Sequence, residues 1–488
     1  MERRKVRAVP GWLRPPAWTA AIGGGLWLVI GHGFANYDAL YSLVWGQQLS
    51  RGETPQYNLP VAPTPHPLGT VIGLILSPLG PGGAEAALVV IAYLALGALG
   101  YLVYRLGAQW FGSPVGLLAA IIVLTREPIL SYGIRAYVDI PYLALVLGAV
   151  LVESRRPRAG APVLALLAVA GLLRPEAWLF SAVYLVLLAL PLRLGPRAGA
   201  GPVRELPALA PLAVIAASAP ALWFLADLLV TGNPFWSLTK TRHTAETLKR
   251  VTGLAHVPTA GPRRLGEVLR EPVLFGAGVG GLLSLAWLRA RALLGAAVGV
   301  VAVVAFAILA TAGLPIVTRY VMLPAAILSV FCGAGAFGWL WLPRGDRRRL
   351  WWRAASLVVL AGLVAFIPSQ VHRLNRTFDA LGRQQRIQRD LVALVDDGSI
   401  GLRCAPVAVP NHRPVPLLAL RLRVQPGRII DAQVTPVVRG TFIEPASAAV
   451  AHDYILDPHD PHPLTASVPP GFRLTASNRS WHVYERCR

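Results

Sequence analysis

Long apolar runs separated by short polar stretches fill the first three quarters of the chain. A helix needs about 20 apolar residues to cross the hydrocarbon core of a bilayer, and most of these runs have about that length. Hydropathy therefore predicts a mostly α-helical, polytopic membrane bundle of about eleven spans. We place the spans at about residues 17–35, 84–106, 114–130, 137–152, 161–173, 177–193, 207–230, 272–288, 292–313, 318–341 and 352–370.

The pattern changes after residue 371. Residues Asn375 to Asp396 place apolar side chains at helical spacing, which predicts a helix. Four short apolar or alternating stretches follow it and are separated by Pro and Gly, so we expect strands at residues 406–409, 428–430, 453–456 and 481–484. The chain is thus expected to form a transmembrane module over residues 1–371 and a small α/β domain over residues 372–488.

A polar stretch follows the first predicted span and begins with Asn36. Behind Asn36, apolar and aromatic positions share one helical stripe, which predicts a helix lying in the membrane interface with aromatic anchors. Asp38 stands at its start, and two interpretations of this acid stay open. Asn36 caps the helix and Asp38 serves its dipole, or Asp38 has a functional role, as ionisable groups at membrane depth commonly do.

Composition and charge agree with a membrane protein. Of the 488 residues, 55% are hydrophobic and 14% are charged, whereas a soluble globular chain carries about 25% charged residues. A net charge of +22 would suggest nucleic-acid binding in a soluble protein. Many Arg residues here fall in short loops on one side of the predicted bundle, the pattern of cytoplasmic loops. We therefore expect a multi-pass plasma-membrane protein with a cytoplasmic N-terminus, an extracytoplasmic C-terminal domain and no nucleic-acid partner.

One long loop does not follow this charge pattern. Residues 231–271 are predicted to lie on the outer side, yet they carry Lys240, Arg242, Lys249, Arg250, Arg263 and Arg264. Long loops can cross a membrane despite positive charge, so the predicted topology stands. These cations in one outer loop indicate an anionic neighbour.

The cysteines and the motifs of the sequence indicate which kinds of disulfide, phosphate-binding and metal sites to expect. Cys332 lies in an apolar run, and Cys404 and Cys487 would be able to form a disulfide in an extracytoplasmic domain, although sequence alone does not decide this. The sequence has no Gly-rich phosphate loop, Walker motif or cysteine pattern for zinc. A His/Asp cluster suits several metal ions, but its interleaved prolines favour an exposed loop, and we predict no metal site there. Its members are His452, Asp453, Asp457, His459, Asp460 and His462.

Polar residues recur at the outer ends of the predicted spans. Asp139, Glu176 and Arg319 each open a span, and helix capping would explain either of the two acids. Any one of the three residues alone would not indicate a site. Placing these three residues and Asp38 near lipid costs free energy, and so their recurrence at one face indicates a functional site. A carboxylate can take a proton from an acceptor hydroxyl or amine, and arginines can hold a phosphate leaving group. Outside the cytoplasm, a donor carried on a membrane lipid phosphate fits this set.

Several motifs carry a family resemblance across about residues 17–370. Tyr37-Asp38 with its helix, Pro65-His66-Pro67-Leu68, Tyr137-Val138-Asp139-Ile140-Pro141, Arg174-Pro175-Glu176 and Thr318-Arg319-Tyr320 follow one another in this order. In this arrangement the sequence resembles the GT-C superfamily, integral-membrane glycosyltransferases that use polyprenyl-phosphate sugars. The resemblance is to the branch that contains protein O-mannosyltransferases and bacterial aminoarabinose transferases.

The resemblance implies roles for individual residues. Asp38 would be the general base, or the carboxylate that orients the acceptor, in an inverting transfer, and Asp139 would line the same cavity. Arg319, Arg174 and Arg135 would contact the lipid phosphate. Glu176, His66 and Tyr320 complete the expected substrate-binding set. Ala39 stands where many members have a second acid, which argues against a metal-assisted mechanism and a protein-mannosylating substrate; participation of a divalent cation stays open.

The expected function is therefore an inverting transfer of a sugar from a polyprenyl phosphate to a cell-envelope glycan, lipid or protein. The sugar, the acceptor and the oligomeric state are left open. A non-enzymatic lipid or polysaccharide transporter or flippase is the alternative, and a scaffold whose C-terminal domain binds a partner is a third possibility. A transporter predicts charges near the middle of several spans. The predicted spans carry almost none, with Asp227 as a near-edge exception.

Overall fold

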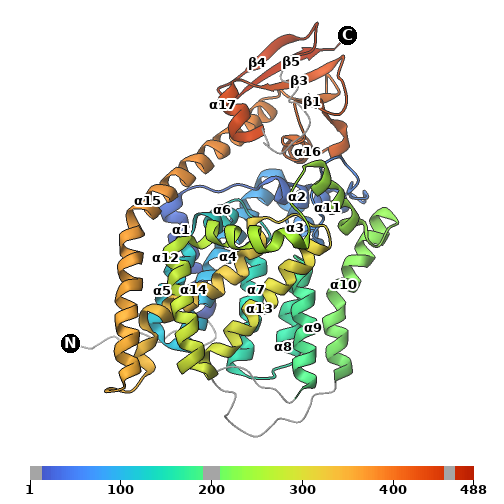
Figure 1. Ribbon diagram of the computed structural model, residues 1–488. Helices are drawn as coiled ribbons and strands as arrows, with labels where there is room; N and C mark the ends of the chain where they lie inside the picture. The colour runs from blue at the N-terminus through green and yellow to red at the C-terminus, as the bar shows by residue number, and fades with distance from the viewer. Residues whose placement is uncertain (1–13, 191–208, 456–467, 488) are drawn as a thin grey trace, which may run out of the picture.

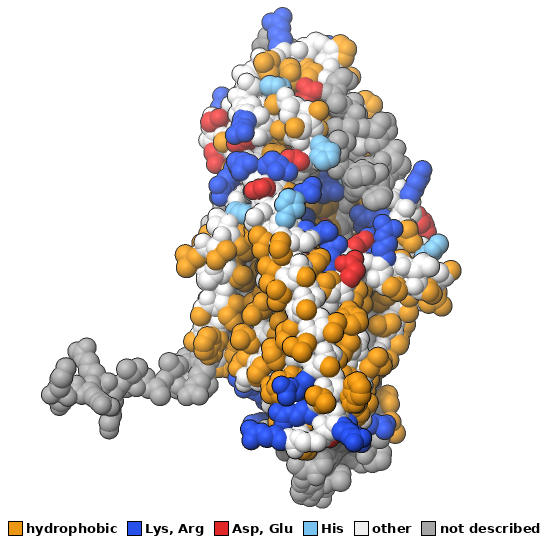
Figure 2. All heavy atoms as spheres, turned by 60° about the vertical axis from the view of Figure 1, so that its left-hand side comes forward, with side chains coloured by type: hydrophobic (Ala, Val, Ile, Leu, Met, Phe, Trp, Pro, Cys, Tyr) orange, Lys and Arg blue, Asp and Glu red, His pale blue; other side chains and the backbone are white. Residues whose placement is uncertain are grey.

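The computed structural model describes residues 14–190, 209–455 and 468–487. A helical bundle forms the larger part, and a small domain with a β-sheet stands at one end of it (Figure 1). We call this end of the bundle the domain end. Figure 2 shows a broad apolar surface on one face of the bundle, with Lys and Arg on both sides of it, at the end opposite the domain and next to the domain. This arrangement is that of a multi-pass membrane protein.

The bundle consists of a main body of helices and a layer of helices at the domain end (Figure 1). The helices of the main body are α1 (Arg14–Ile30), α4 (Gly80–Phe111), α5 (Ser113–Leu124), α7 (Asp139–Arg155), α8 (Ala161–Gly171), α9 (Glu176–Ala189), α10 (Leu209–Thr231), α12 (Val257–Trp287), α13 (Arg289–Thr311), α14 (Met322–Phe337) and α15 (Arg347–Asp396). The helices of the layer at the domain end are α2 (Tyr37–Ser50), α3 (Pro67–Leu76), α6 (Glu127–Ile134) and α11 (Trp236–Thr247).

The predicted number of spans is not confirmed. Six of the described helices are long and apolar enough to cross a membrane, or seven if α5 and α6 count as one span. The predicted span at 114–130 is in fact this pair, which bends by 64° at the break. Helices α8 and α9 are apolar but have only 11 and 14 residues.

Close helix packing in the centre of the bundle depends on glycine. Helix α14 is the most enclosed of the candidate spans, with 89% of its apolar window buried. A Cβ atom at Gly280 of α12 would lie 1.9 Å from the carbonyl oxygen of Phe331 in α14. Only a residue without a side chain permits this approach, which is how small residues pack membrane helices.

Helix α2 starts where the sequence predicts, but its surroundings differ from the prediction. The Asn36 side chain caps it, accepting hydrogen bonds from the backbone N–H groups of Asp38 (2.6 Å) and Ala39 (3.1 Å). Tyr41 and Trp45 are 1% and 0% exposed, so they are not membrane-interface anchors. They pack inside the protein, against Tyr57 and Ala62 of the loop after α2. Helix α16 (Val415–Leu422) of the C-terminal domain covers the part of α2 that carries Leu40 and Val44.

Helix α15 joins the two predicted domains without a break. The predicted span at 352–370 and the predicted helix from Asn375 are parts of this one helix of 50 residues. The expected domain boundary at 371/372 therefore falls inside α15. The change in composition at that point lies within one helix and does not mark its end. Figure 1 shows α15 running from the bundle into the C-terminal domain.

The C-terminal domain has a five-stranded sheet in the order β2-β1-β3-β5-β4. Strand β1 (Val407–Val409) runs parallel to β2 (Ile429–Asp431) and β3 (Gly440–Pro445). Strands β4 (Arg473–Ser477) and β5 (Trp481–Arg486) complete the sheet as an antiparallel edge.

Sequence patterns located three of these strands and placed one strand wrongly. The predictions near 406–409, 428–430 and 481–484 are confirmed by β1, β2 and β5. The strand expected at 453–456 is wrong, because a π-helical turn occupies Ala451–Ile455. Its apolar residues serve packing: Ile455 is buried, and the Tyr454 ring lies edge-on to Trp481 at 5.8 Å.

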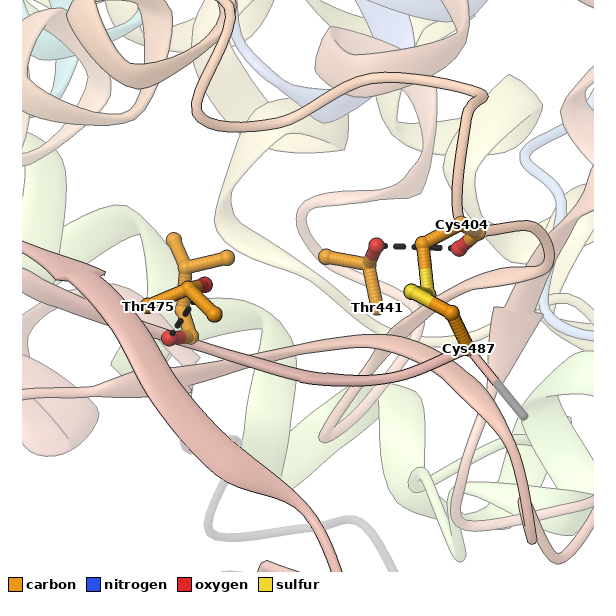
Figure 3. Close-up of a disulfide and its surroundings, with 5 residues drawn as sticks. Cys404, Thr441, Thr475 and Cys487 are labelled. Carbon is orange, nitrogen blue, oxygen red and sulfur yellow. Dashed lines mark hydrogen bonds between the residues drawn. A yellow bond between two sulfur atoms is a disulfide. The ribbon is translucent and has the colours of Figure 1, made fainter.

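Cys404 and Cys487 form a disulfide that ties the start of the C-terminal domain to its last strand. Thr441 lies beside the bridge, and its hydroxyl donates to the carbonyl oxygen of Cys404 at 3.0 Å (Figure 3). Within the predicted His/Asp cluster, Asp453 pairs with Arg383 at 2.8 Å. Residues 456–467, which carry most of that cluster, lie outside the described residues.

Candidate active site

A cavity of about 400 Å³ opens at the domain end of the bundle. It is lined by α2 and the loop after it, by the turns that precede α9 and α14, by α11 and by a turn of the C-terminal domain. Six of the eight residues predicted for the site line this cavity: Asp38, His66, Arg174, Glu176, Arg319 and Tyr320. Residues spread over most of the membrane module therefore meet at one place.

Asp38 and Arg319 form an ion pair in the cavity wall, with 3.2 Å between Oδ2 and Nη1. Asp38 lies in the first turn of α2, and Arg319 lies in the short 3₁₀ turn Thr318–Val321 before α14. The Thr318 hydroxyl fixes that turn by donating to Glu267 at 2.9 Å. Both side chains of the pair keep about a quarter of their exposure, 24% for Asp38 and 23% for Arg319. The carboxylate is therefore held in place and accessible from the cavity.

Arg174 lies between two carboxylates, those of Asp139 and Glu176. Its Nη2 lies 2.5 Å from Glu176 Oε1, and its Nη1 pairs with Asp139 Oδ1. The guanidinium also stacks on the Tyr320 ring, 4.5 Å from the ring centre. We expected Asp139 to line the cavity, but it is 1% exposed and lies behind Arg174. A buried charge needs a partner, and Asp139 provides one for Arg174.

Arg135 also lies behind the cavity wall. Its guanidinium donates to the Ser131 carbonyl (3.1 Å) and hydroxyl (2.9 Å) and lies over the rings of Tyr132 and Tyr137. Those two tyrosines line the cavity, whereas Arg135 is not among the described lining residues. Its backbone carbonyl accepts from the Asn36 side chain at 2.7 Å. Arg135 thus supports the start of α2, and the expected contact with a lipid phosphate would require it to move.

His66 reaches the cavity from the residue just before α3. Its ring lies edge-on to Trp223, with 5.8 Å between ring centres. Burial lowers the pKa of His66 to about 3, so the ring is neutral near pH 7. His66 therefore offers a polar, uncharged group to a ligand.

Further cations line the cavity and were not singled out as site residues. In total the lining has seven Lys and Arg side chains and two carboxylates. Lys240, Lys249 and Arg250 come from α11 and the turn after it, within the basic loop for which the sequence predicted an anionic neighbour. No carboxylate among the described residues lies within ion-pair distance of these three. His412 and Arg413 of the C-terminal domain also line the cavity, and no sequence pattern pointed to them.

Comparison with known proteins identifies the fold. No protein-family model and no curated protein matches the sequence. The structure is similar to that of ArnT from Cupriavidus metallidurans bound to undecaprenyl phosphate, with a TM-score of 0.54 and 15% sequence identity over 98% of both chains. It is similar to the apo state of the same protein, with a TM-score of 0.53 and 16% identity over 97% of both chains. The chain thus shares the fold of ArnT along nearly its whole length, including the C-terminal domain.

Proposed function

We propose that this protein is an inverting glycosyltransferase that moves a sugar from a polyprenyl-phosphate donor to an acceptor of the cell envelope. The observation that carries the proposal is the Asp38–Arg319 pair in a cation-rich cavity of a membrane bundle. A solved protein of the same fold was crystallised with undecaprenyl phosphate, which supports a lipid-phosphate donor. The motif order of the GT-C superfamily supports the same reaction class.

In the proposed reaction Asp38 acts as the general base. The acceptor hydroxyl or amine attacks the anomeric carbon on the side opposite the phosphate, and its proton passes to Asp38. The bond between the anomeric carbon and the phosphate oxygen breaks, and polyprenyl phosphate leaves with the electron pair. Arg319 orients the Asp38 carboxylate through their ion pair. The configuration at the anomeric carbon is inverted.

The leaving phosphate needs positive charge that is not already neutralised. Asp139 and Glu176 neutralise Arg174, so Arg174 has little charge to offer to the phosphate. Lys240, Lys249 and Arg250 line the same cavity without a described carboxylate partner. We assign the phosphate to these three residues, because charge-assisted hydrogen bonds to phosphate are strong. Arg319 has one carboxylate partner where Arg174 has two, and its other N–H groups can add a contact to the phosphate.

The proposed reaction takes place on the outer face of the plasma membrane. Short basic loops at the end opposite the C-terminal domain would then be cytoplasmic, together with the N-terminus. The Cys404–Cys487 disulfide fits a domain in an oxidising compartment.

The transporter alternative gains no support from Asp227, the charge closest to a span interior. This carboxylate is 2% exposed and accepts hydrogen bonds from both the backbone N–H and the hydroxyl of Ser237, each at 2.8 Å. It therefore fixes the start of α11, and a relay role would require these bonds to break.

Purified full-length protein tests the proposal. It would be incubated with undecaprenyl phosphates carrying a hexose, a pentose or an amino sugar, together with an envelope extract of the source organism. Mass spectrometry would follow the release of undecaprenyl phosphate and the appearance of sugar on an acceptor. We expect release with at least one donor. If no donor is consumed and undecaprenyl phosphate does not raise the melting temperature of the protein, the proposed function is wrong.

A further inference from the structure

One turn of the C-terminal domain forms part of the cavity wall. Residues Asn411–Pro414 connect β1 to α16, at the carboxyl end of the parallel strands. Loops at this edge of a parallel sheet are where α/β domains commonly bind ligands. His412 and Arg413 of this turn line the same cavity as Asp38.

Hydrogen bonds hold this turn in one conformation. Asn411 is 1% exposed, and its amide nitrogen donates to the Ile455 carbonyl at 2.8 Å. Its amide oxygen accepts from the backbone N–H of Arg413 at 3.0 Å. The N–H of Val415 donates to the His412 carbonyl at 3.2 Å. The two cavity-lining side chains therefore project from a fixed backbone.

The domain that carries this turn is docked on the membrane module by specific polar contacts. Arg421 of α16 pairs with Glu85 of α4 at 2.6 Å. At the C-terminal end of α16, Arg51 donates to the Arg423 carbonyl at 3.1 Å. Gln56 follows α2 in the chain and donates to Gln425 at 3.0 Å. The docking thus involves the region of α2, the helix that positions Asp38.

The ring of His412 contacts Tyr37, the residue next to the proposed base Asp38. The His412 ring lies edge-on to the Tyr37 ring at 5.4 Å, and Tyr37 immediately precedes Asp38 at the start of α2. The His412 side chain is largely enclosed, with 6% of the residue exposed. The turn of the C-terminal domain and the proposed base therefore border the same part of the cavity.

We propose that His412 and Arg413 bind the acceptor, so that the C-terminal domain is the acceptor-binding part of the active site. This inference rests on the proposed function. A lipid-linked donor reaches the cavity from the bilayer around the bundle, whereas the domain lies beyond the end of the bundle (Figure 1). The two side chains therefore meet the polar part of the acceptor that lies outside the bilayer, whether the acceptor is a glycan, a protein or a lipid head group. A guanidinium with five N–H donors can engage hydroxyl or anionic oxygens of such a molecule.

Steady-state kinetics of the full-length protein separate acceptor binding from donor binding. The probes are the undecaprenyl-phosphate sugar that the wild type consumes and the envelope extract that accepts the sugar. For Arg413→Gln we expect the amount of extract needed for half-maximal transfer to rise about tenfold or more, as loss of a hydrogen bond to a charged group implies. The KM for the donor should stay unchanged. The amount of extract that Arg413→Lys needs should lie between the amounts for the wild type and for Arg413→Gln. His412→Gln should also need more extract than the wild type.

The control is Arg473→Gln, an exposed arginine of the same domain that does not line the cavity. It should leave both constants unchanged, and all variants should keep the wild-type melting temperature. If Arg413→Gln and His412→Gln keep the wild-type extract dependence while transfer continues, the inference is wrong and the proposed function stands. If both variants raise the donor KM instead, the turn binds the donor and the inference is also wrong. If the wild type consumes no donor and undecaprenyl phosphate does not raise its melting temperature, the proposed function is wrong and the inference is wrong with it.

Discussion

Asp38 and Arg319 are 281 residues apart in the sequence and form a 3.2 Å ion pair in the wall of one cavity. Each residue opens a helical element at the domain end of the bundle. Asp38 alone would be explained by capping, because an acid at a helix start interacts favourably with the helix dipole. The pairing of Asp38 with Arg319 in a cation-rich cavity places a base and a positive charge where a phosphate-linked sugar could react.

The position of Asp38 depends on two glycines that let α2 and α3 touch. A Cβ atom at Gly46 would lie 2.2 Å from the backbone of Gly73, so a methyl group there must force the helices apart. Overpacking of this kind costs about 1–3 kcal/mol. We expect Gly46→Ala to lower the melting temperature and the transfer rate. Gly24→Ala is the control, since a Cβ there meets nothing within 4 Å; equal behaviour of the two variants would contradict the account.

Asp139 is expected to act by holding Arg174 rather than by touching substrate. Its removal leaves a buried guanidinium with Glu176 alone, and breaking a buried pair costs about 3–5 kcal/mol. Asp139→Asn should therefore lower both the melting temperature and kcat. Glu53→Gln removes half of the more exposed pair with Arg51 and should have little effect on either quantity. An inactive Asp139→Asn protein with wild-type stability would instead favour a direct catalytic role for this acid.

The cations of α11 and its following turn should bind the lipid phosphate. In Lys240→Gln/Arg250→Gln two positive charges without a described partner are lost, and each hydrogen bond to a charged group contributes about 1.5–3 kcal/mol. The Kd for undecaprenyl phosphate, measured by thermal stabilisation, should rise by about tenfold or more. Arg403→Gln, an exposed residue outside the cavity, should leave the Kd unchanged. Unchanged affinity in the double variant would remove these residues from the phosphate site.

The disulfide should stabilise the C-terminal domain. It joins cysteines 83 residues apart, and a closed loop of that length corresponds to about 4 kcal/mol in the chain-entropy model. We expect Cys404→Ser/Cys487→Ser to unfold the domain at a lower temperature. Reductant should lower the melting temperature of the wild type but not that of the double variant. Wild-type resistance to reductant at the unfolding temperature would argue against the bridge.

Much of the fold and part of the site could be predicted from local sequence. The apolar runs located the helices, and Asn36 marked the start of α2 because capping depends only on neighbouring residues. The continuous helix α15 was missed, because hydropathy reports the surroundings of a helix and not its ends. The aromatic residues of α2 were assigned to the membrane interface, because a stripe of apolar residues does not reveal that the loop after the helix folds back over it.

The sequence located some residues of the site and missed others. Six predicted residues line the cavity, because span ends at one face of a bundle converge. Whether a side chain faces the cavity or lies behind it depends on helix rotation, and so Asp139 and Arg135 were misplaced. His412 and Arg413 come from a separate domain whose docking leaves no mark on their own part of the sequence.

The most direct test of the account is the activity of Asp38→Asn, which keeps the shape of the side chain and removes the base. In a strain that lacks the gene, mass spectrometry of envelope glycans and lipid-linked sugars would compare plasmid-borne wild type with the variant. Loss of a general base typically lowers a rate by about 10²–10⁴-fold, so we expect the variant to leave the modified product missing and its lipid-linked donor accumulated. The purified variant should still bind undecaprenyl phosphate. Wild-type amounts of product from Asp38→Asn would contradict the central claim.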